Sequence, residues 1–192
     1  TIVYSKINIV NQFGSKFFDL YKYNLNSEEE TQLTYGKRLY SPSYNPDLNK
    51  IAAIYQYDGT SNIMISDLSD SLSFKQLTSY DNGFQMFKVD WSNDLIIYDG
   101  VSKHGRNIYS VDMNDLSKTE KSSLTDERDP MFSGDQNILM WSEDRDKVFN
   151  LYYEKEFFRN IEFDINKKVH SNVIWFGIEK DLRSILSNNS KK

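Results

Sequence analysis

A strand-like pattern that recurs at nearly constant spacing constrains this chain more than any other feature. Each copy begins with a polar residue and continues with alternating apolar positions, and the copies begin at Asp19, Asn62, Asn107 and Asn150. Successive copies start 43, 45 and 43 residues apart. A period of this size indicates an architecture of repeated units that bury their apolar faces against one another.

Two further markers keep the same order and period. A Leu-Thr pair follows the strand pattern in the first three copies, at Leu33-Thr34, Leu77-Thr78 and Leu124-Thr125. An aromatic residue, turn-forming residues and an aspartate occur together at 44–47, 91–94 and 132–135, each time just before a short apolar run. One unit therefore contains four short strands with short, antiparallel-compatible connections. Four strands in about 45 residues is the size of one β-propeller blade.

The order of these markers resembles the repeats of the TolB-like β-propellers. Those repeats contain an aromatic-Ser-Pro-Asp-Gly turn, an apolar strand, an Asn-Ile-Tyr-x-x-Asp-Leu strand and a closing Leu-Thr. Here the clearest matches are Tyr44-Asn-Pro-Asp47 and Asn107-Ile-Tyr-Ser-Val-Asp112, and the resemblance covers roughly residues 1–153. The glycine of the family's turn is replaced by Leu48, Leu95 and Gln136, so we expect a different turn geometry.

The sequence thus predicts an all-β fold, a β-propeller of about four four-stranded antiparallel blades, with a short C-terminal helix. We expect the blades in 1–169, with the first blade incomplete because Ile2–Tyr4 already corresponds to a second strand. The family it resembles is usually six-bladed, so the chain is either part of a larger propeller or a ring that closes in an unusual way.

The last part of the chain departs from the repeat. Alternating apolar residues at 161–165 predict a strand piece that completes the fourth blade. An apolar stripe with spacings of four, four and three residues predicts a packing helix and a frayed tail in 170–192. The stripe consists of Ile174, Ile178, Leu182 and Ile185.

The sequence predicts packed positions for three large aromatic residues. Trp91 and Phe132 each open an aromatic-turn-aspartate marker, and we expect both to be buried. Trp141 ends an apolar run, and we expect it to pack between adjacent blades.

Composition narrows the functional classes. The chain has no cysteine, which excludes disulfides, thiolate zinc sites and thiol catalysis. The formal net charge is −5 and the basic residues are scattered, which argues against a nucleic-acid partner. The sequence contains no long apolar run, so no membrane span is expected. The resemblance to TolB-like proteins implies a periplasmic or secreted protein.

Few residues in the sequence suggest a catalytic or metal-binding site. The two histidines, His104 and His170, lack the Gly-x-Ser-x-Gly turn of a hydrolytic triad and the companions of a metal site. The carboxylate pair Asp126-Glu127 is compatible with glycoside hydrolysis, but the sialidase-type aspartate box is absent. We therefore expect no enzymatic activity, no metal and no cofactor.

One face of the predicted propeller gathers residue types that dominate binding hot spots. The loops between second and third strands and those between blades emerge on the same face. They carry Arg38, Tyr80, His104, Arg106, Arg128 and Arg145. Two interpretations stay open for this set: ordinary solvated residues paired with Asp81, Glu127 and Asp144, or a ligand-binding surface.

Two functions fit the sequence. The first is a non-enzymatic module that binds a protein or peptide, which the resemblance to TolB-like cell-envelope scaffolds implies. The alternative is a substrate-gating propeller of a serine peptidase or related hydrolase, with its catalytic domain outside this chain. A partial propeller also exposes its end blades, so a homodimer through those blades is expected, or else a cap formed by the tail.

Overall fold

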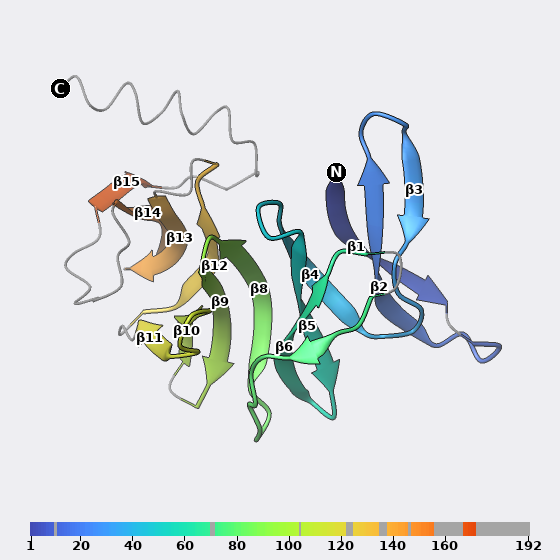
Figure 1. Ribbon diagram of the computed structural model, residues 1–192. Helices are drawn as coiled ribbons and strands as arrows, with labels where there is room; N and C mark the ends of the chain where they lie inside the picture. Colours follow the sequence, from blue (N-terminus) through green and yellow to red (C-terminus); the bar gives the residue numbers. More distant parts are fainter. Residues whose placement is uncertain are drawn as a thin grey trace.

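The protein is described by a computed structural model whose regular structure is β-strand throughout the described part of the chain. The described residues are 1–9, 11–69, 72–103, 105–121, 125–134, 138–145, 147–155 and 167–171. Their strands form four separate antiparallel sheets that stand side by side (Figure 1).

The sheets follow one another in chain order, and each is a simple meander. The first contains β1 (Ile2–Ile9), β2 (Lys16–Asn24) and β3 (Glu29–Gln32). The second contains β4 (Leu39–Asn45), β5 (Lys50–Tyr57), β6 (Thr60–Asp67) and β7 (Lys75–Gln76). The third contains β8 (Gln85–Ser92), β9 (Leu95–Ser102), β10 (Gly105–Asp112) and β11 (Lys118–Lys121). The fourth contains β12 (Glu127–Phe132), β13 (Ile138–Arg145), β14 (Val148–Lys155) and β15 (Lys167–Ser171).

This arrangement confirms the predicted antiparallel blades, and the first sheet has three strands where the others have four. The first strands of the complete sheets lie next to each other, because β4 contacts β8 and β8 contacts β12. They are therefore the inner strands of a propeller. Each of them shifts register against the second strand, between Tyr40 and Ser43 in β4, between Met86 and Val89 in β8 and between Arg128 and Met131 in β12.

Two of the turns without the family's glycine, those in the second and third blades, are built on asparagine. In the second blade, Leu48 donates its backbone N–H to the Asn45 side chain over 3.1 Å, and Asn49 takes a φ of 49°. In the third blade, Asn93 takes the positive φ, 47°. Asparagine tolerates this left-handed conformation better than most other residues with a β-carbon.

Hydrophobic clusters lie between the blades. Leu20, Leu39 and Ala53 join the first and second sheets, whereas Ile54 and Tyr98 belong to a cluster that joins the second and third. The third and fourth sheets are joined by Ile97, Ile108, Leu139, Trp141 and Tyr152. Contact between large apolar side chains of neighbouring sheets is what holds a radial array together.

The aromatic expectations are confirmed at two positions and wrong at the third. Trp91 is 5% exposed. Trp141 is fully buried between the third and fourth blades. Phe132 is only partly buried. It is the last residue of the inner strand β12 and packs at the edge of its cluster, where fewer neighbours cover it.

β15 takes the outermost place in the fourth blade, paired with β14. It runs across the expected boundary between 169 and 170. The strand piece expected at 161–165 and the C-terminal helix both lie outside the described residues.

Candidate functional site

One end of the blades carries the turns between second and third strands together with the connections between blades. We call it the turn face, defined by residues 33–38, 57–60, 77–85, 102–103, 105–106 and 125–129. In Figure 1 the β5–β6 turn and the connection into β8 lie together at the lower end of the view. The β5–β6 turn and this connection therefore lie at the same end of the second blade.

Backbone bonds fix the central part of this face. Tyr57 pairs with Thr60, which leaves the two-residue turn Asp58-Gly59 with φ values of 48° and 71°. Positive φ at both central residues is the geometry of a tight type I′ hairpin, for which Asp-Gly is a favoured sequence. The β5–β6 turn is then tied to the next connection, because Ser61 donates its N–H to the Phe84 carbonyl over 2.8 Å and the Gln85 side-chain amide donates to the Gly59 carbonyl.

The repeated Leu-Thr marker acts at the start of these connections. The Thr78 hydroxyl accepts the Ile63 N–H over 2.9 Å and donates to Asn62 Oδ1 over 3.0 Å. Asn62 Oδ1 also accepts the Tyr80 N–H at 2.7 Å. Asn62, which starts the second strand pattern, therefore anchors the chain that leaves its own blade and places Tyr80 on the turn face.

Tyr80 lies in an aromatic cluster. Its ring stacks on Phe84 with 4.0 Å between centroids, and its hydroxyl shares a 2.7 Å hydrogen bond with that of Tyr98. Burial raises the pKa of Tyr80, Tyr98 and Tyr109. A β-carbon at Gly100 would lie only 2.4 Å from Phe84 Cζ, so glycine is needed there for the ring to reach this position.

Arg38 lies just before β4, exposed on the turn face. Its guanidinium stacks on the Phe17 ring, 4.1 Å from the centroid. Among the described residues Arg38 makes no ion pair, so its charge is available at the surface.

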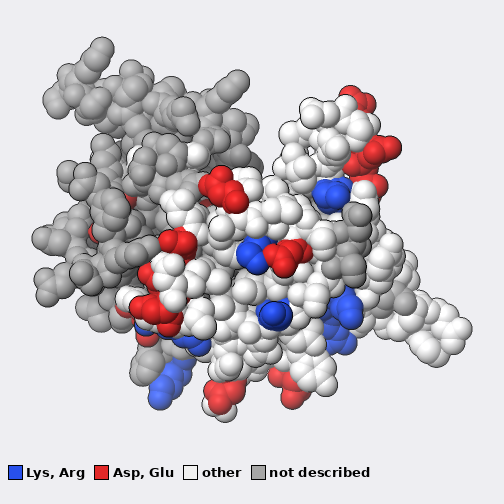
Figure 2. All heavy atoms as spheres, viewed as in Figure 1, with Lys and Arg blue, Asp and Glu red and all other residues white. Residues whose placement is uncertain are grey.

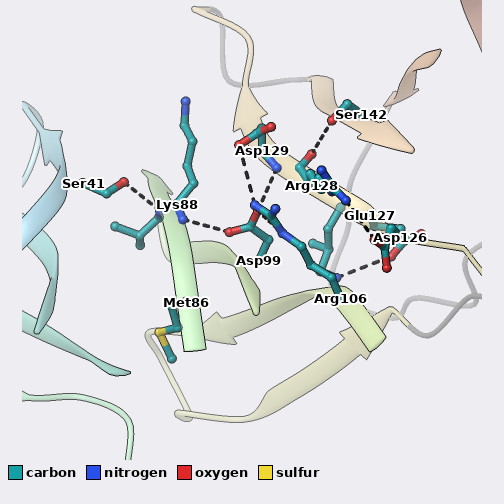
Figure 3. Close-up of polar contacts among 12 residues, drawn as sticks. Ser41, Met86, Lys88, Asp99, Arg106, Asp126, Glu127, Arg128, Asp129 and Ser142 are labelled. Atoms are coloured by element: carbon teal, nitrogen blue, oxygen red, sulfur yellow. Dashed lines mark hydrogen bonds and ion pairs between the residues drawn. The ribbon is translucent and has the colours of Figure 1, made fainter. Parts of the chain in front are cut away.

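Arg106 is held differently, in a buried ion-pair cluster (Figure 3). Asp99 is completely buried and accepts hydrogen bonds from Arg106 Nε at 3.2 Å, from the Lys88 N–H at 2.8 Å and from the Asp129 N–H at 2.9 Å. The Arg106 side chain is only 14% exposed. Asp99 therefore joins the third blade to the fourth, and Arg106, which is paired with it, has little freedom to reach a ligand.

The structure brings Arg128 close to this cluster. Arg128 pairs with Asp126 at 2.9 Å and stacks over the Phe149 ring at 4.4 Å. Arg145 ends β13; its side chain lies outside the described part, and so does His104.

Two hollows open beside the β5–β6 turn. One has a volume of about 490 Å³ and is lined by Tyr55, Tyr57, Asp58, Thr60, Asn62, Gln76, Tyr80, Asp81, Asn82 and Gly83. The other has a volume of about 440 Å³ and is lined by Lys16, Phe17, Phe18, Arg38, Tyr40, Gln56, Tyr57, Asp58 and Gly59. Tyr57 and Asp58 line both, and neither was a candidate from the sequence. The Asp58-Gly59 pair between two strand patterns marks the turn, but only the fold shows what lies on either side of it.

The described residues contain neither a cluster of metal-ligating side chains nor a membrane-spanning helix. Where the structure describes side chains, no group of three His, Asp or Glu residues is placed to hold a metal ion. None of the described residues forms a helix with the length and apolarity needed to cross a bilayer.

Solved structures with this arrangement support the resemblance drawn from the repeats. TolB from Acinetobacter baumannii matches with a TM-score of 0.69 at 15% identity, over 87% of this chain and 40% of that one. A putative TolB from Agrobacterium tumefaciens matches with a TM-score of 0.66 at 14% identity, over 88% of this chain and 61% of that one. The fold is a TolB-like β-propeller. This chain thus spans only part of the length of either TolB structure.

A similar fold occurs in the propeller domain of a protease. The β-propeller domain of the Trilobed protease from Pyrococcus furiosus matches with a TM-score of 0.56 at 14% identity, over 92% of this chain and 55% of that one. No family model matches the sequence, and no curated protein matches it. At these identities the likeness establishes the fold, and the function has to be argued from the site.

Proposed function

We propose that this TolB-like propeller is a non-enzymatic module that binds a protein or peptide on its turn face. The observation that carries the proposal is the pair of hollows surrounded by Arg38, Tyr57 and Tyr80. Arginine and tyrosine are the side chains most enriched at binding hot spots. The backbone bonds between the β5–β6 turn and the following connection hold the hollows in shape, which lowers the entropic cost of binding.

Within this proposal the remaining candidates have different roles. Arg106 and Arg128 fix the turn face through ion pairs, while Arg38 and Tyr80 contact the ligand. His104 and Arg145 are proposed to contribute from the same face. A periplasmic or secreted location is part of the proposal, since it follows from the resemblance to TolB-like proteins.

A random peptide library displayed on phage tests the proposed function. We expect selection on the wild-type protein to enrich peptides whose binding the Tyr57→Ser variant loses. Tyr57 is 63% exposed, so this substitution should leave the fold intact. Leu48→Ser is the matched control, because Leu48 is 44% exposed on the opposite end of the same blade.

Two results would overturn the proposal. One is that the enriched peptides bind the Tyr57→Ser variant as well as they bind the wild type. The other is turnover of a peptide, ester or glycoside substrate that a single substitution in this chain abolishes.

The likeness to the Trilobed protease propeller favours a second candidate. In that case the propeller controls access of substrates to a hydrolase domain encoded in the same reading frame. Sequencing the complete frame tests this, and a downstream segment with a Gly-x-Ser-x-Gly nucleophile turn would support it.

A further inference from the structure

The two hollows on the turn face carry opposite charges. They are separated by the ridge Tyr57–Gly59, in which Tyr57 and Asp58 line both hollows and Gly59 lines only the second. We call them the acidic hollow, on the side of Asp81, and the basic hollow, on the side of Arg38. Figure 2 shows acidic and basic side chains together at the lower end of the view, where Figure 1 places the β5–β6 turn.

The acidic hollow has the features that attract a cation. Asp58 and Asp81 are its charged lining residues, both exposed, and its lining contains no Lys, Arg or His. Tyr55 and Tyr57 stack with 6.3 Å between centroids and add aromatic surface. Carboxylates beside tyrosine rings suit an ammonium or guanidinium group, which gains both charge attraction and a cation–π contact.

The basic hollow has the opposite balance. Lys16 and Arg38 face a single carboxylate, Asp58. The stack on Phe17 holds the Arg38 guanidinium in place, so little side-chain freedom is lost when it binds an anion. A guanidinium whose charge is unpaired among the described residues can form a bidentate bond with a carboxylate.

Hydrogen bonds tie the wall between the hollows to the chain on both of its sides. The Gly83 N–H donates to Thr60 Oγ1 over 3.2 Å on one side, and the Gln56 N–H donates to the Arg38 carbonyl over 3.4 Å on the other. A ligand that reaches both hollows must therefore pass over the Tyr57–Gly59 ridge in an extended form.

We propose that the ridge is straddled by an extended peptide segment that places a lysine or arginine side chain in the acidic hollow and an aspartate or glutamate side chain in the basic hollow. This inference rests on the proposed function and specifies its ligand. The charges set the direction in which the segment lies, because the reversed segment would bring like charges together on both sides of the ridge.

Fluorescence anisotropy with defined peptides tests this assignment. The probes are short fluorescein-labelled Gly-Ser peptides with one lysine and one glutamate at several spacings, and matched peptides in which norleucine replaces the lysine or glutamine replaces the glutamate. We expect the best-spaced lysine–glutamate peptide to bind more tightly than either matched peptide, and added salt to reduce the difference.

A double-mutant cycle identifies the contacts. Asp81→Asn should weaken the lysine–glutamate peptide by about three- to tenfold and leave the norleucine peptide unchanged. Arg38→Gln should have the same selective effect on the glutamate-containing peptide. Asp47→Asn, which removes an exposed carboxylate on the opposite end of the second blade, is the matched control.

The outcomes separate this inference from the proposed function. If no lysine–glutamate peptide binds more tightly than its matched peptides, or if Asp81→Asn weakens all of them equally, the charge assignment is wrong. The proposed function still stands in that case if library-selected peptides require Tyr57. If those peptides ignore Tyr57 as well, both are wrong.

Discussion

At the scale of single residues, the same marker has two different roles in the repeats. Thr34 and Thr78 each accept a backbone N–H of their own blade, from Leu20 and Ile63, over 2.9 Å. Thr125 instead donates to Glu143 Oε1 of the next blade over 2.6 Å. The buried Glu127 carboxylate accepts the Ile108 N–H in its place, over 3.4 Å. A repeated residue type therefore does not guarantee a repeated contact.

Thr78→Val should destabilise the protein by about 1–3 kcal/mol, because it leaves the buried Ile63 N–H without its acceptor. Thr78→Ser keeps the hydroxyl and should lose only the contribution of one methyl group, about 1 kcal/mol. Urea unfolding of the two variants measures the difference. Equal stability of the valine variant and the wild type would show that the hydroxyl is not needed.

At the scale of strands, interfaces between sheets carry most of the large buried side chains. Trp141 on β13 packs with Ile97 and Ile108, which come from β9 and β10 of the preceding blade. Its indole N–H also donates to Glu143 Oε2 over 3.3 Å. One side chain thus joins two blades that are otherwise separate sheets.

Trp141→Ala should lower the free energy of unfolding by about 3–5 kcal/mol, because it removes a fully buried aromatic side chain and leaves a cavity between the sheets. Trp141→Phe fills much of that space and should cost less. Denaturant unfolding compares the two variants. A loss below about 1 kcal/mol for the alanine variant would mean that the blades repack around the gap.

The strand pattern was predictable because pairing between consecutive strands is local. Two-residue turns such as Asp58-Gly59 and alternating apolar residues specify each hairpin within a short stretch of sequence. Contacts between blades were harder to predict. Phe132 shows why, because the burial of a residue at the end of an inner strand depends on which side chains of the neighbouring sheet cover it. The turn-face residues were predicted from topology alone. Topology does not show that Arg106 already forms an ion pair with the buried Asp99.

At the scale of the whole molecule, buried tyrosines couple stability to alkaline pH. Burial raises the pKa of Tyr109 to about 12, and burial also raises the pKa of Tyr98. In the unfolded chain these phenols ionise near pH 10. Between about pH 10 and 12 the unfolded state therefore binds fewer protons than the native state, and stability falls as the pH rises.

We expect the free energy of unfolding to decline by about 1.4 kcal/mol per pH unit for each such tyrosine within this window. Tyr109→Phe removes one of these groups, so its stability should depend less steeply on pH. Urea unfolding at a series of alkaline pH values, with phenolate absorbance recorded in parallel, measures both effects. Identical slopes for the variant and the wild type would contradict the assignment.

The first sheet suggests how two molecules could meet. Its three strands leave β1 paired with β2 alone, and Ile7 and Ile9 on β1 are 54% and 68% exposed. We predict a homodimer through the end blades, which buries such apolar residues across a two-fold axis. Ile7→Lys should then shift the protein to monomer in sedimentation at micromolar concentration. A wild-type protein that stays monomeric and folded would exclude the dimer.

The sequence by itself determined the repeat, the four-strand unit and the turns, because hydrophobic alternation and turn-forming residues act over a few neighbouring positions. Tertiary structure alone decided which side chains meet. Asp99 and Asp129 are 30 residues apart in sequence, yet the Asp129 N–H bonds to the Asp99 carboxylate. The basic hollow likewise combines residues of the first and second blades, and the acidic hollow combines the second blade with the connection that follows it. Such sites depend on how separate sheets are placed in space, and side chains distant in sequence encode that placement only through their mutual packing.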